Sequence, residues 1–396
     1  MLSNLAAAPS DPILGVTEAF NADPAPDKVN LGVGVYLDEN GKTPLMDCVQ
    51  AVETDLAARR RPRGYLPQTG MPAFDAAVQE LVFGPGCPAV AAGRVATLQT
   101  LAGTGALRLG AGLLALGSPD ATVWLSDPSW ENHESLFSRA GLAIGRHRYY
   151  DPVGRRLDVD GMVEDLAQAA PGGVVVLHAC CHNPTGYDLT EADWDRVVAV
   201  IAERRLVPFI DMAYQGLARG LGEDRYAVEA CVRAGLDFLV ANSFSKIFGL
   251  YGERVGALSI VASDPAEASR IVSQAKVVVR SLYSNPPTQG AAIVSAILTT
   301  PELRSSWEQE LAAMRQRIVE MRAGFRAGLE AAGVTRDVCF ITSQTGLFSY
   351  SGLTADQMRR LREEHIYGLD SGRLCVAGLN PHNLDKVVAA VAAVMG

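Results

Sequence analysis

Short apolar runs alternate with amphipathic segments through the middle of the chain, a pattern typical of a parallel β-sheet covered by helices. Between the apolar runs, residues 190–204 have helical periodicity, with Thr190 as the expected N-cap and Asp193 in the capping-box position. Consecutive parallel strands require such crossovers, which are right-handed. The runs predicted to be strands are 121–126, 174–177, 206–210, 238–241 and 255–261.

The pattern changes in the last third of the chain. Residues 301–332 indicate a long charged helix, 340–342 and 347–350 indicate short strands, and 383–395 indicate a final amphipathic helix. We therefore expect an α/β protein with a three-layer α/β/α large domain, a mainly parallel sheet and a smaller α+β domain. The predicted divisions are 1–36 for an N-terminal arm and part of the small domain, 37–311 for the large domain, and 312–396 for the C-terminal small domain.

Composition limits the classes of function. The chain has 396 residues, of which 48% are hydrophobic and 20% charged, as expected of a globular protein with more than one domain. The net charge of -9 argues against nucleic-acid or anionic-membrane partners, and we interpret the basic run 59–63 as the solvated end of a helix. With no membrane-spanning apolar run, no signal-peptide pattern and seven cysteines that form no disulfide framework, a cytoplasmic location is expected.

Polar side chains follow four of the predicted strands, at the edge of the sheet where open α/β proteins bind their ligands. They lie in 127–130, in 182–186, at Asp211 and in 243–246. A further turn, Gly103-Thr104-Gly105, opens an Ala- and Leu-rich helix whose free N-terminal amides can bind an anion.

The segment Ser243-Phe244-Ser245-Lys246, with Arg254 eight residues later, combines one lysine with several phosphate-binding groups. A lysine amine forms a Schiff base with an aldehyde, and hydroxyl and guanidinium groups bind a phosphate monoester. An aldehyde together with a phosphate indicates pyridoxal 5'-phosphate as the cofactor. Taken alone, the segment also fits a solvated loop, since most lysines are surface residues.

A pyridoxal-phosphate site also requires an acid against the pyridine nitrogen and a donor to the phenolate oxygen. Asp211 is the candidate acid, and Tyr214 is close enough in sequence to reach the same ring. Asn183 is a second candidate donor, and Trp130 offers an indole face for ring stacking. Each residue also has an ordinary interpretation, as a helix cap, a turn asparagine or a core tryptophan.

Two histidines and two cysteines, His178, Cys180, Cys181 and His182, could indicate a metal site. We predict no metal, because no further ligand cluster has zinc spacing and the following Asn-Pro-Thr-Gly is a turn.

Together these segments resemble the class I aminotransferases of the fold type I pyridoxal-phosphate enzymes, in the subgroup of aspartate and aromatic-amino-acid aminotransferases. The similarity extends from residue 11 to the end of the chain. The blocks that carry it are 30–36 (NLGVGVY), 103–107 (GTGAL), 181–186 (CHNPTG), 211–216 (DMAYQG), 243–254 (SFSKIFGLYGER) and 283–287 (YSNPP).

The resemblance implies a role for each candidate. Lys246 would bind the cofactor aldehyde and, once freed by substrate, move a proton between substrate and cofactor. Asp211 would pair with the pyridinium with support from His133, while Tyr214 and Asn183 would bind the phenolate oxygen. The other cofactor contacts would come from Gly103, Thr104, Trp130, Ser243, Ser245 and Arg254, with Tyr65 reaching in from the partner subunit.

For the substrate, the resemblance implies that Arg373 binds the α-carboxylate through a bidentate pair, and that Arg280 contacts a distal carboxylate across a dimer interface. Because the site would be shared between subunits, a homodimer is expected. Two departures from the family pattern are Ala102, in the Gly-rich turn, and Leu282, near the distal pocket. The remaining substrate contacts would come from Gly34, Trp130, Asn183 and Phe348.

The expected reaction moves the amino group of tyrosine, phenylalanine or aspartate to 2-oxoglutarate by a ping-pong mechanism. Segments 65–67, 130–133, 242–248 and 374–380 are more similar to bacterial tyrosine-type enzymes than to aspartate-type ones. One alternative is an aspartate aminotransferase with little aromatic activity. A lyase or decarboxylase that uses the same cofactor and fold is a second, against which Arg373 argues. A non-catalytic regulator is not expected, because the chain leaves no room for a DNA-binding segment before its first family block.

Overall fold

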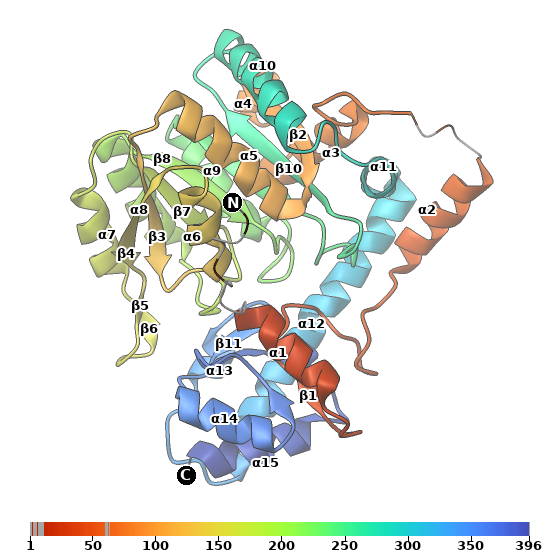
Figure 1. Cartoon of the computed structure of the whole chain (residues 1–396), viewed down its shortest axis with the longest axis vertical. Coiled ribbons are helices and arrows are strands. Elements are labelled where there is room, and N and C mark those ends of the chain that lie inside the picture. The colour runs from red at the N-terminus through yellow and green to blue at the C-terminus, as the bar shows by residue number, and fades with distance from the viewer. Residues whose placement is uncertain (1, 3–5, 7–11, 60–61, 63, 396) are drawn as a thin grey trace. The chain divides into compact units, whose positions relative to one another are not determined.

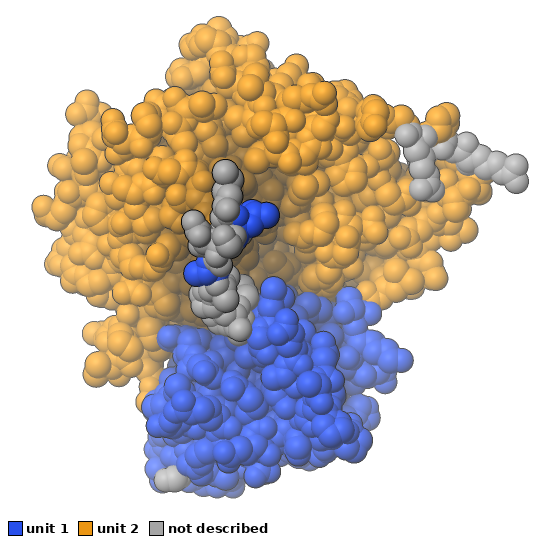
Figure 2. Space-filling model, in the orientation of Figure 1, with its two compact units in different colours: residues 1–43, 317–396 blue, residues 44–316 orange. Residues whose placement is uncertain are grey.

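The computed structural model describes residues 2, 6, 12–59, 62 and 64–395. Two compact units make up the chain, one formed by residues 1–43 and 317–396 and the other by residues 44–316 (Figure 2). The domain boundaries expected after residues 36 and 311 stay predictions. Within the basic run 59–63, Arg60, Arg61 and Arg63 lie outside the described residues.

A seven-stranded, mainly parallel sheet forms the centre of the larger unit (Figure 1). The sequence pattern predicted a mainly parallel sheet and five of its strands, but not those at 95–101 and 143–148. The strand order is β2-β10-β9-β8-β7-β3-β4, and every neighbouring pair from β9 to β4 is parallel. The strands are β2 Val95–Leu101, β3 Thr122–Asp127, β4 Ala143–Arg148, β7 Val174–His178, β8 Val207–Met212, β9 Phe238–Ser243 and β10 Val255–Val261.

Strand β10 differs from the parallel arrangement expected for it, because it runs antiparallel to both β9 and β2. Residues 244–254, which connect β9 to β10, form turns rather than a crossover helix, and a direct connection of this kind returns the chain antiparallel. The reversal has a consequence for the site. It pairs Gly256 with Ser243, so the start of β10 lies beside the carboxyl end of β9.

Helix α5 (Ala102–Gly117) packs against the sheet, where it contacts β2, β9 and β10, and it also contacts the helix α10 (Pro265–Leu282). Phe137 and Phe209 are fully buried in the core and meet edge to face, with ring centroids 5.6 Å apart. The helices are α2 Asp47–Ala58, α3 Pro72–Phe83, α4 Pro88–Ala91, α5 Ala102–Gly117, α6 Glu131–Ser138, α7 Val159–Ala167, α8 Glu191–Arg204, α9 Tyr226–Arg233, α10 Pro265–Leu282 and α11 Gln289–Thr299.

Helix starts follow the sequence signals closely. Thr190 caps α8, its side chain accepts from the backbone N–H of Asp193, and the Asp193 side chain accepts from the Thr190 backbone, which completes the predicted capping box. The long helix expected at 301–332 is α12, Pro301–Ala331, whose residues continue from the larger unit into the smaller one.

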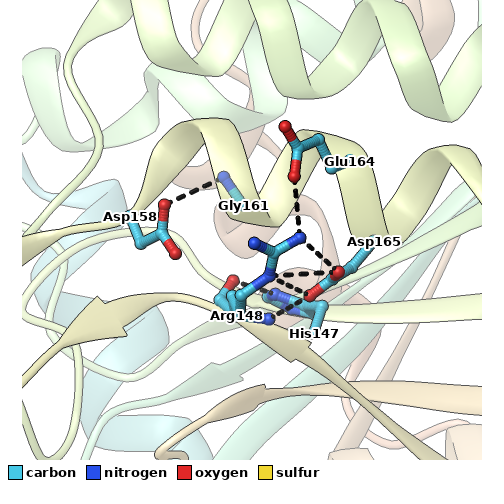
Figure 3. Close-up of polar contacts among 6 residues, drawn as sticks. All are labelled: His147, Arg148, Asp158, Gly161, Glu164 and Asp165. Atoms are coloured by element: carbon cyan, nitrogen blue, oxygen red, sulfur yellow. Dashed lines mark hydrogen bonds and ion pairs between the residues drawn. The ribbon is translucent and has the colours of Figure 1, made fainter.

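Strand β4 forms one edge of the sheet, and α7 is fixed to its end by Arg148 (Figure 3). The Arg148 guanidinium donates to both carboxylate oxygens of Asp165 at 2.7–3.1 Å and to Glu164 at 2.9 Å. These hydrogen bonds hold the pKa of Asp165 below its usual value. Asp158 caps the start of α7 by accepting from the Gly161 N–H. The edge of the sheet opposite β2 is therefore fixed by charge pairs.

The smaller unit combines short two-stranded sheets with helices, as expected of an α+β domain. Strand β1 (Val29–Asn30) pairs in parallel with β12 (Ile366–Tyr367), and β11 (Phe348–Tyr350) pairs antiparallel with β13 (Arg373–Cys375). A hairpin of two short strands, β5 Tyr150–Asp151 and β6 Arg156–Leu157, belongs to the larger unit. The helices of the smaller unit are α1 Pro12–Ala22, α13 Phe340–Ser343, α14 Ala355–Glu363 and α15 Leu384–Met395.

One prediction for this unit is wrong. Residues 340–342, expected as a strand, lie in the short helix α13. A three-residue apolar run is too short for its periodicity to distinguish a helix from a strand. The strand expected at 347–350 is β11, and the final helix expected at 383–395 is α15.

Among the residues that the structure describes, no helix is both long and apolar enough to cross a bilayer.

Candidate active site

The carboxyl ends of β7, β8 and β9 bring the polar residues of the larger unit together. In the register of the sheet, Asp211 on β8 lies opposite His178 on β7 and Ala241 on β9. Ser243 ends β9, and Lys246 follows it within the connection to β10. Ligands of open α/β sheets bind at this end of the strands.

Asp211 forms a buried pair with His133. The Nε2 atom of His133 lies 3.0 Å from Oδ2 of Asp211, and the histidine Nδ1 atom lies 2.9 Å from the hydroxyl of Ser129. Burial alone would raise the pKa of Asp211, but the hydrogen bond and charge of His133, together with the charge of Lys246, bring it below its usual value. Asp211 is therefore ionised at neutral pH and can face a cationic ring nitrogen.

Two more histidines lie behind this pair. The His178 ring is 5.1 Å from the His133 ring and 4.3 Å from the His182 ring, measured between centroids. His182 is held by Ser126 at 3.0 Å and by Thr185 at 2.9 Å. Burial, followed by the charge of His133, lowers the pKa of His178 to about 3, so its ring is neutral at physiological pH.

The ligand atoms of His133, His178 and Asp211 lie within 4.8 Å of one another, close enough to hold a metal ion. Two of the three groups are hydrogen-bonded to each other, however, because His133 uses its Nε2 atom on Asp211. The two cysteines of the sequence motif, Cys180 and Cys181, are not part of this cluster. The absence of a metal stays a prediction.

Lys246 lies beside Tyr214. The ammonium nitrogen is 4.8 Å from the centroid of the tyrosine ring, and its charge contributes to the lowered pKa of Asp211. Tyr214 is itself buried, at 5% exposure. The lysine, the acid and the tyrosine predicted to act together therefore belong to one cluster.

The predicted phosphate ligands also converge. The Ser243 hydroxyl lies 3.2 Å from the Ser245 hydroxyl, and an Nη atom of Arg254 donates to Ser245 at 3.4 Å. Helix α5 begins against them, since a Cβ atom placed on Gly103 would lie 3.2 Å from Cβ of Ser243. Thr104 is the third residue of that helix. Hydroxyls, a guanidinium and helix N-terminal amides together form an anion-binding cup.

The backbone around this cup is strained. Ala102 and Arg254 both have positive φ, at 57° and 54°, and the Ala102 N–H donates to the Arg254 carbonyl at 3.1 Å. Left-handed conformations of residues other than glycine persist where the surrounding structure fixes them, and they cluster at functional sites. Ala102, which departs from the family pattern in sequence, is therefore part of the joint that places Arg254 beside helix α5.

The donor set fits pyridoxal phosphate. An ionised buried carboxylate, a lysine close to it and a cup of phosphate ligands are the three groups that bind the ring nitrogen, the aldehyde and the phosphate of this cofactor. Trp130 occupies the N-cap position of α6, and its ring meets the His133 ring edge to face with centroids 5.3 Å apart. Asn183 is buried in the turn after β7.

The predicted carboxylate-binding residues of the smaller unit also form a group. An Nη atom of Arg373 donates to the Gly32 carbonyl at 2.7 Å, and the guanidinium carbon lies 4.3 Å from the centroid of the Phe348 ring. Gly34 lies against the same ring, where an added Cβ would be 2.7 Å from Phe348 Cζ. Arg373 is therefore held rigidly by backbone and aromatic contacts.

Two predicted site residues are exposed on the surface of this chain. The Tyr65 side chain is 94% exposed, and Arg280, in the last turn of α10, donates to the Ser284 hydroxyl. The residues that sequence reasoning missed are Ser129, the partner of His133, and His178 in its role as a neutral neighbour of that ring. The spacing of Ser129 and His133, four residues apart at the start of a helix, is the only local signal for the first.

A mainly parallel sheet with a lysine, an acid and an anion cup at the carboxyl ends of its strands defines the fold type I pyridoxal-phosphate enzymes. Comparison with known proteins agrees. Residues 26–391 match the family model for aminotransferase class I and II. The chain therefore belongs to the class I and II aminotransferases, and it is a pyridoxal-phosphate-dependent enzyme.

Three similar proteins cover the chain along its whole length. It is 52% identical over 396 residues to an aspartate aminotransferase of Pseudomonas aeruginosa, with 100% of both chains covered. It is 54% identical, with a TM-score of 0.98 and 100% of both chains covered, to an aromatic-amino-acid aminotransferase of Burkholderia pseudomallei that is covalently bound to pyridoxal phosphate. A third, 42% identical with a TM-score of 0.97, covers 100% of this chain and 99% of its own. It is an aromatic amino acid aminotransferase of Psychrobacter that was cocrystallised with aspartic acid.

Proposed function

We propose that the enzyme transfers the amino group of aromatic amino acids and of aspartate to 2-oxoglutarate, giving the keto acid and glutamate. The observation that carries the amino-transfer part is the ionised Asp211, paired with His133 and close to Lys246. Support for dual specificity comes from similar proteins of both kinds, at 52% and 54% identity, and from an aromatic enzyme cocrystallised with aspartic acid.

Lys246 and Asp211 have complementary tasks in this proposal. Pyridoxal phosphate, when bound, supplies an aldehyde that accepts the amino group and a pyridinium ring that withdraws electrons from the substrate α-carbon. Asp211 keeps the ring nitrogen protonated through its own negative charge. The amine of Lys246 takes a proton from the substrate α-carbon and returns it on the cofactor side. Tyr214, in contact with Lys246, donates to the phenolate oxygen together with Asn183.

The remaining residues hold the ligands in place. Thr104, Ser243, Ser245 and Arg254 bind the phosphate, with Gly103 allowing the helix to approach, and Trp130 stacks on the ring. Arg373 binds the α-carboxylate of every substrate. Gly34 and Phe348 shape its surroundings. A retained α-carboxylate separates this reaction from decarboxylation.

We further propose a homodimer in which Tyr65 and Arg280 of one subunit complete the site of the other. Their exposure in a single chain supports this, since an aromatic ring that is 94% exposed has no packing role of its own. Arg280 would contact the distal carboxylate of aspartate, glutamate and 2-oxoglutarate. The cytoplasmic location stays a prediction.

Steady-state kinetics with phenylalanine, tyrosine and aspartate, each with 2-oxoglutarate, test the function. We expect keto acid and glutamate in equal amounts from both substrate types, without release of carbon dioxide from phenylalanine or tyrosine. An enzyme that releases carbon dioxide from these two substrates, or forms no glutamate, would be a decarboxylase or lyase. Activity with aspartate alone would leave the aspartate aminotransferase alternative.

A further inference from the structure

Gln99 on strand β2 joins two separate segments of the larger unit to its own strand through hydrogen bonds. Its side chain is fully buried, at 0% exposure. The side-chain Oε1 accepts from the Met71 N–H at 3.2 Å, and Nε2 donates to the Pro287 carbonyl at 2.6 Å. The Gln99 backbone N–H adds a bond to the Thr69 carbonyl at 2.8 Å.

The first of these segments carries Tyr65. A turn closes from the Pro67 carbonyl to the Gly70 N–H at 2.9 Å. Gly70 has φ +97°, and a Cβ at this position would lie 2.2 Å from Cβ of Gln99, so the turn rests directly on the glutamine. Tyr65 lies two residues before this turn. The exposed ring therefore projects from a segment that is anchored on one side.

The second segment follows Arg280. The guanidinium of Arg280 donates to the Ser284 hydroxyl, and the Ser284 N–H donates to the Val279 carbonyl at 3.0 Å. Ser284 has positive φ, at 70°, which turns the chain out of α10. Three residues later Pro287 offers its carbonyl to Gln99. The connection is thus fixed at the helix end and at the sheet.

We propose that Gln99 is a positioning residue that fixes the Tyr65 segment and the Arg280 segment to one strand, so that one subunit presents both residues together to the site of its partner. This inference rests on the proposed function, because it requires the shared site of a homodimer. It assigns Gln99 an effect on the neighbouring subunit's site rather than on the site that contains Lys246 of its own chain. Without the amide, the Met71 N–H and the Pro287 carbonyl lose these hydrogen bonds, and the two segments are no longer joined through one side chain. The Tyr65 segment keeps the backbone bond between Gln99 and Thr69.

Hybrid dimers test the direction of this effect. In a hybrid of one Lys246→Ala subunit and one subunit that keeps Lys246, the single working site uses Tyr65 and Arg280 from the Lys246→Ala subunit. The two subunits carry different affinity tags, so that only hybrids are assayed. Gln99→Met is placed either on the Lys246→Ala subunit or on the other one. With Gln99→Met on the Lys246→Ala subunit, we expect kcat/KM for aspartate to be on the order of tenfold lower than with Gln99→Met on the other subunit, because displacement of a substrate-contacting group slows the reaction. Equal losses, or a larger loss in the second placement, would overturn the proposal.

Matched variants separate this result from general damage. Thr97 lies on the same strand as Gln99, and its hydroxyl is 2.8 Å from the Ser259 hydroxyl on β10. Thr97→Val removes this buried hydrogen bond and should give no difference between placements. Gln99→Glu keeps the acceptor for Met71 but loses the donor to Pro287. It should therefore lower aspartate kcat/KM more than phenylalanine kcat/KM, again in the first placement. If Gln99→Met does not fold, this variant alone decides the proposal.

Tyr65→Phe and Arg280→Ala in the same two placements distinguish failure of this inference from failure of the proposed function. If these two variants lower kcat/KM only when they are on the Lys246→Ala subunit, and the Gln99 variants show no such difference, the shared site stands and the role of Gln99 is refuted. If they lower kcat/KM when they are on the subunit that keeps Lys246, the shared site itself is wrong.

Discussion

His133 uses both ring nitrogens, one on Asp211 at 3.0 Å and one on Ser129 at 2.9 Å. With 0% exposure, the ring has no water to replace either partner. The pair therefore sets the charge of the carboxylate that faces the cofactor ring in the proposed site.

Replacing His133 should weaken cofactor binding. In His133→Leu, the buried Asp211 loses its hydrogen bond, so burial raises its pKa and the carboxylate pairs less well with a cationic ring. A loss of about 1–3 kcal/mol corresponds to roughly a fivefold to 150-fold rise in the Kd for pyridoxal phosphate, measured by titrating the cofactor-free enzyme. Ser129→Ala, which removes only the outer partner, should have a smaller effect. An unchanged Kd in His133→Leu would contradict this role.

Arg373 should affect all substrates alike, because all carry an α-carboxylate. In Arg373→Ala, kcat/KM should fall by about 2–5 kcal/mol, or on the order of thirtyfold to several thousandfold, with phenylalanine and aspartate equally affected. Arg373→Lys keeps the charge but loses the planar guanidinium that contacts Gly32 and Phe348. Its kcat/KM should therefore lie between that of Arg373→Ala and that of the natural protein. If kinetics hardly change in Arg373→Ala, the α-carboxylate binds elsewhere.

Arg280 should distinguish the two substrate types. In Arg280→Ala, kcat/KM for aspartate should fall at least about tenfold more than kcat/KM for phenylalanine, since only aspartate has a distal carboxylate. Arg270→Ala, an exposed arginine on the same helix α10, is the matched control and should leave the ratio unchanged. Equal losses for both substrates would remove Arg280 from substrate recognition.

Asp75 should make stability depend on pH. Its Oδ1 atom has no hydrogen-bond partner among the described residues, and burial raises its pKa to about 8. The folded chain therefore holds this proton more tightly than the unfolded chain, whose value is near 4, so stability falls as pH rises from about 4 to about 8. Asp75→Asn removes that loss. We expect its Tm to exceed that of the natural protein by about a few degrees at pH 8 and by less at pH 5. The same Tm difference at both pH values would refute the buried, protonated carboxyl.

The sequence predicted those elements whose formation depends on residues close together in the chain. The capping box at Thr190 and Asp193 formed as expected, because both residues lie within one turn. The run 340–342 was predicted wrongly, because three apolar residues fit a strand and a helix turn equally well. The antiparallel direction of β10 depends on the connection that precedes it rather than on its own apolar pattern.

The site residues also divide into those that are close together in the sequence and those that are far apart. Ser243, Ser245 and Lys246 lie in one short segment, so their chemistry is visible in the sequence. His133 and Asp211 are 78 residues apart, and only the family resemblance brought them together before the fold was known. Gln99 and Asp75 carry no motif, because their importance comes from burial and from contacts with distant segments.

The central claim is that Lys246 is the residue that binds pyridoxal phosphate covalently. Borohydride reduction of the cofactor-loaded enzyme, followed by proteolysis and mass spectrometry, tests it directly. We expect one labelled peptide, containing Lys246, and no label on the exposed Lys276 of helix α10 or anywhere in the Lys246→Ala variant. A label on any other lysine, or a cofactor that remains unattached after reduction, would contradict the assignment of Lys246.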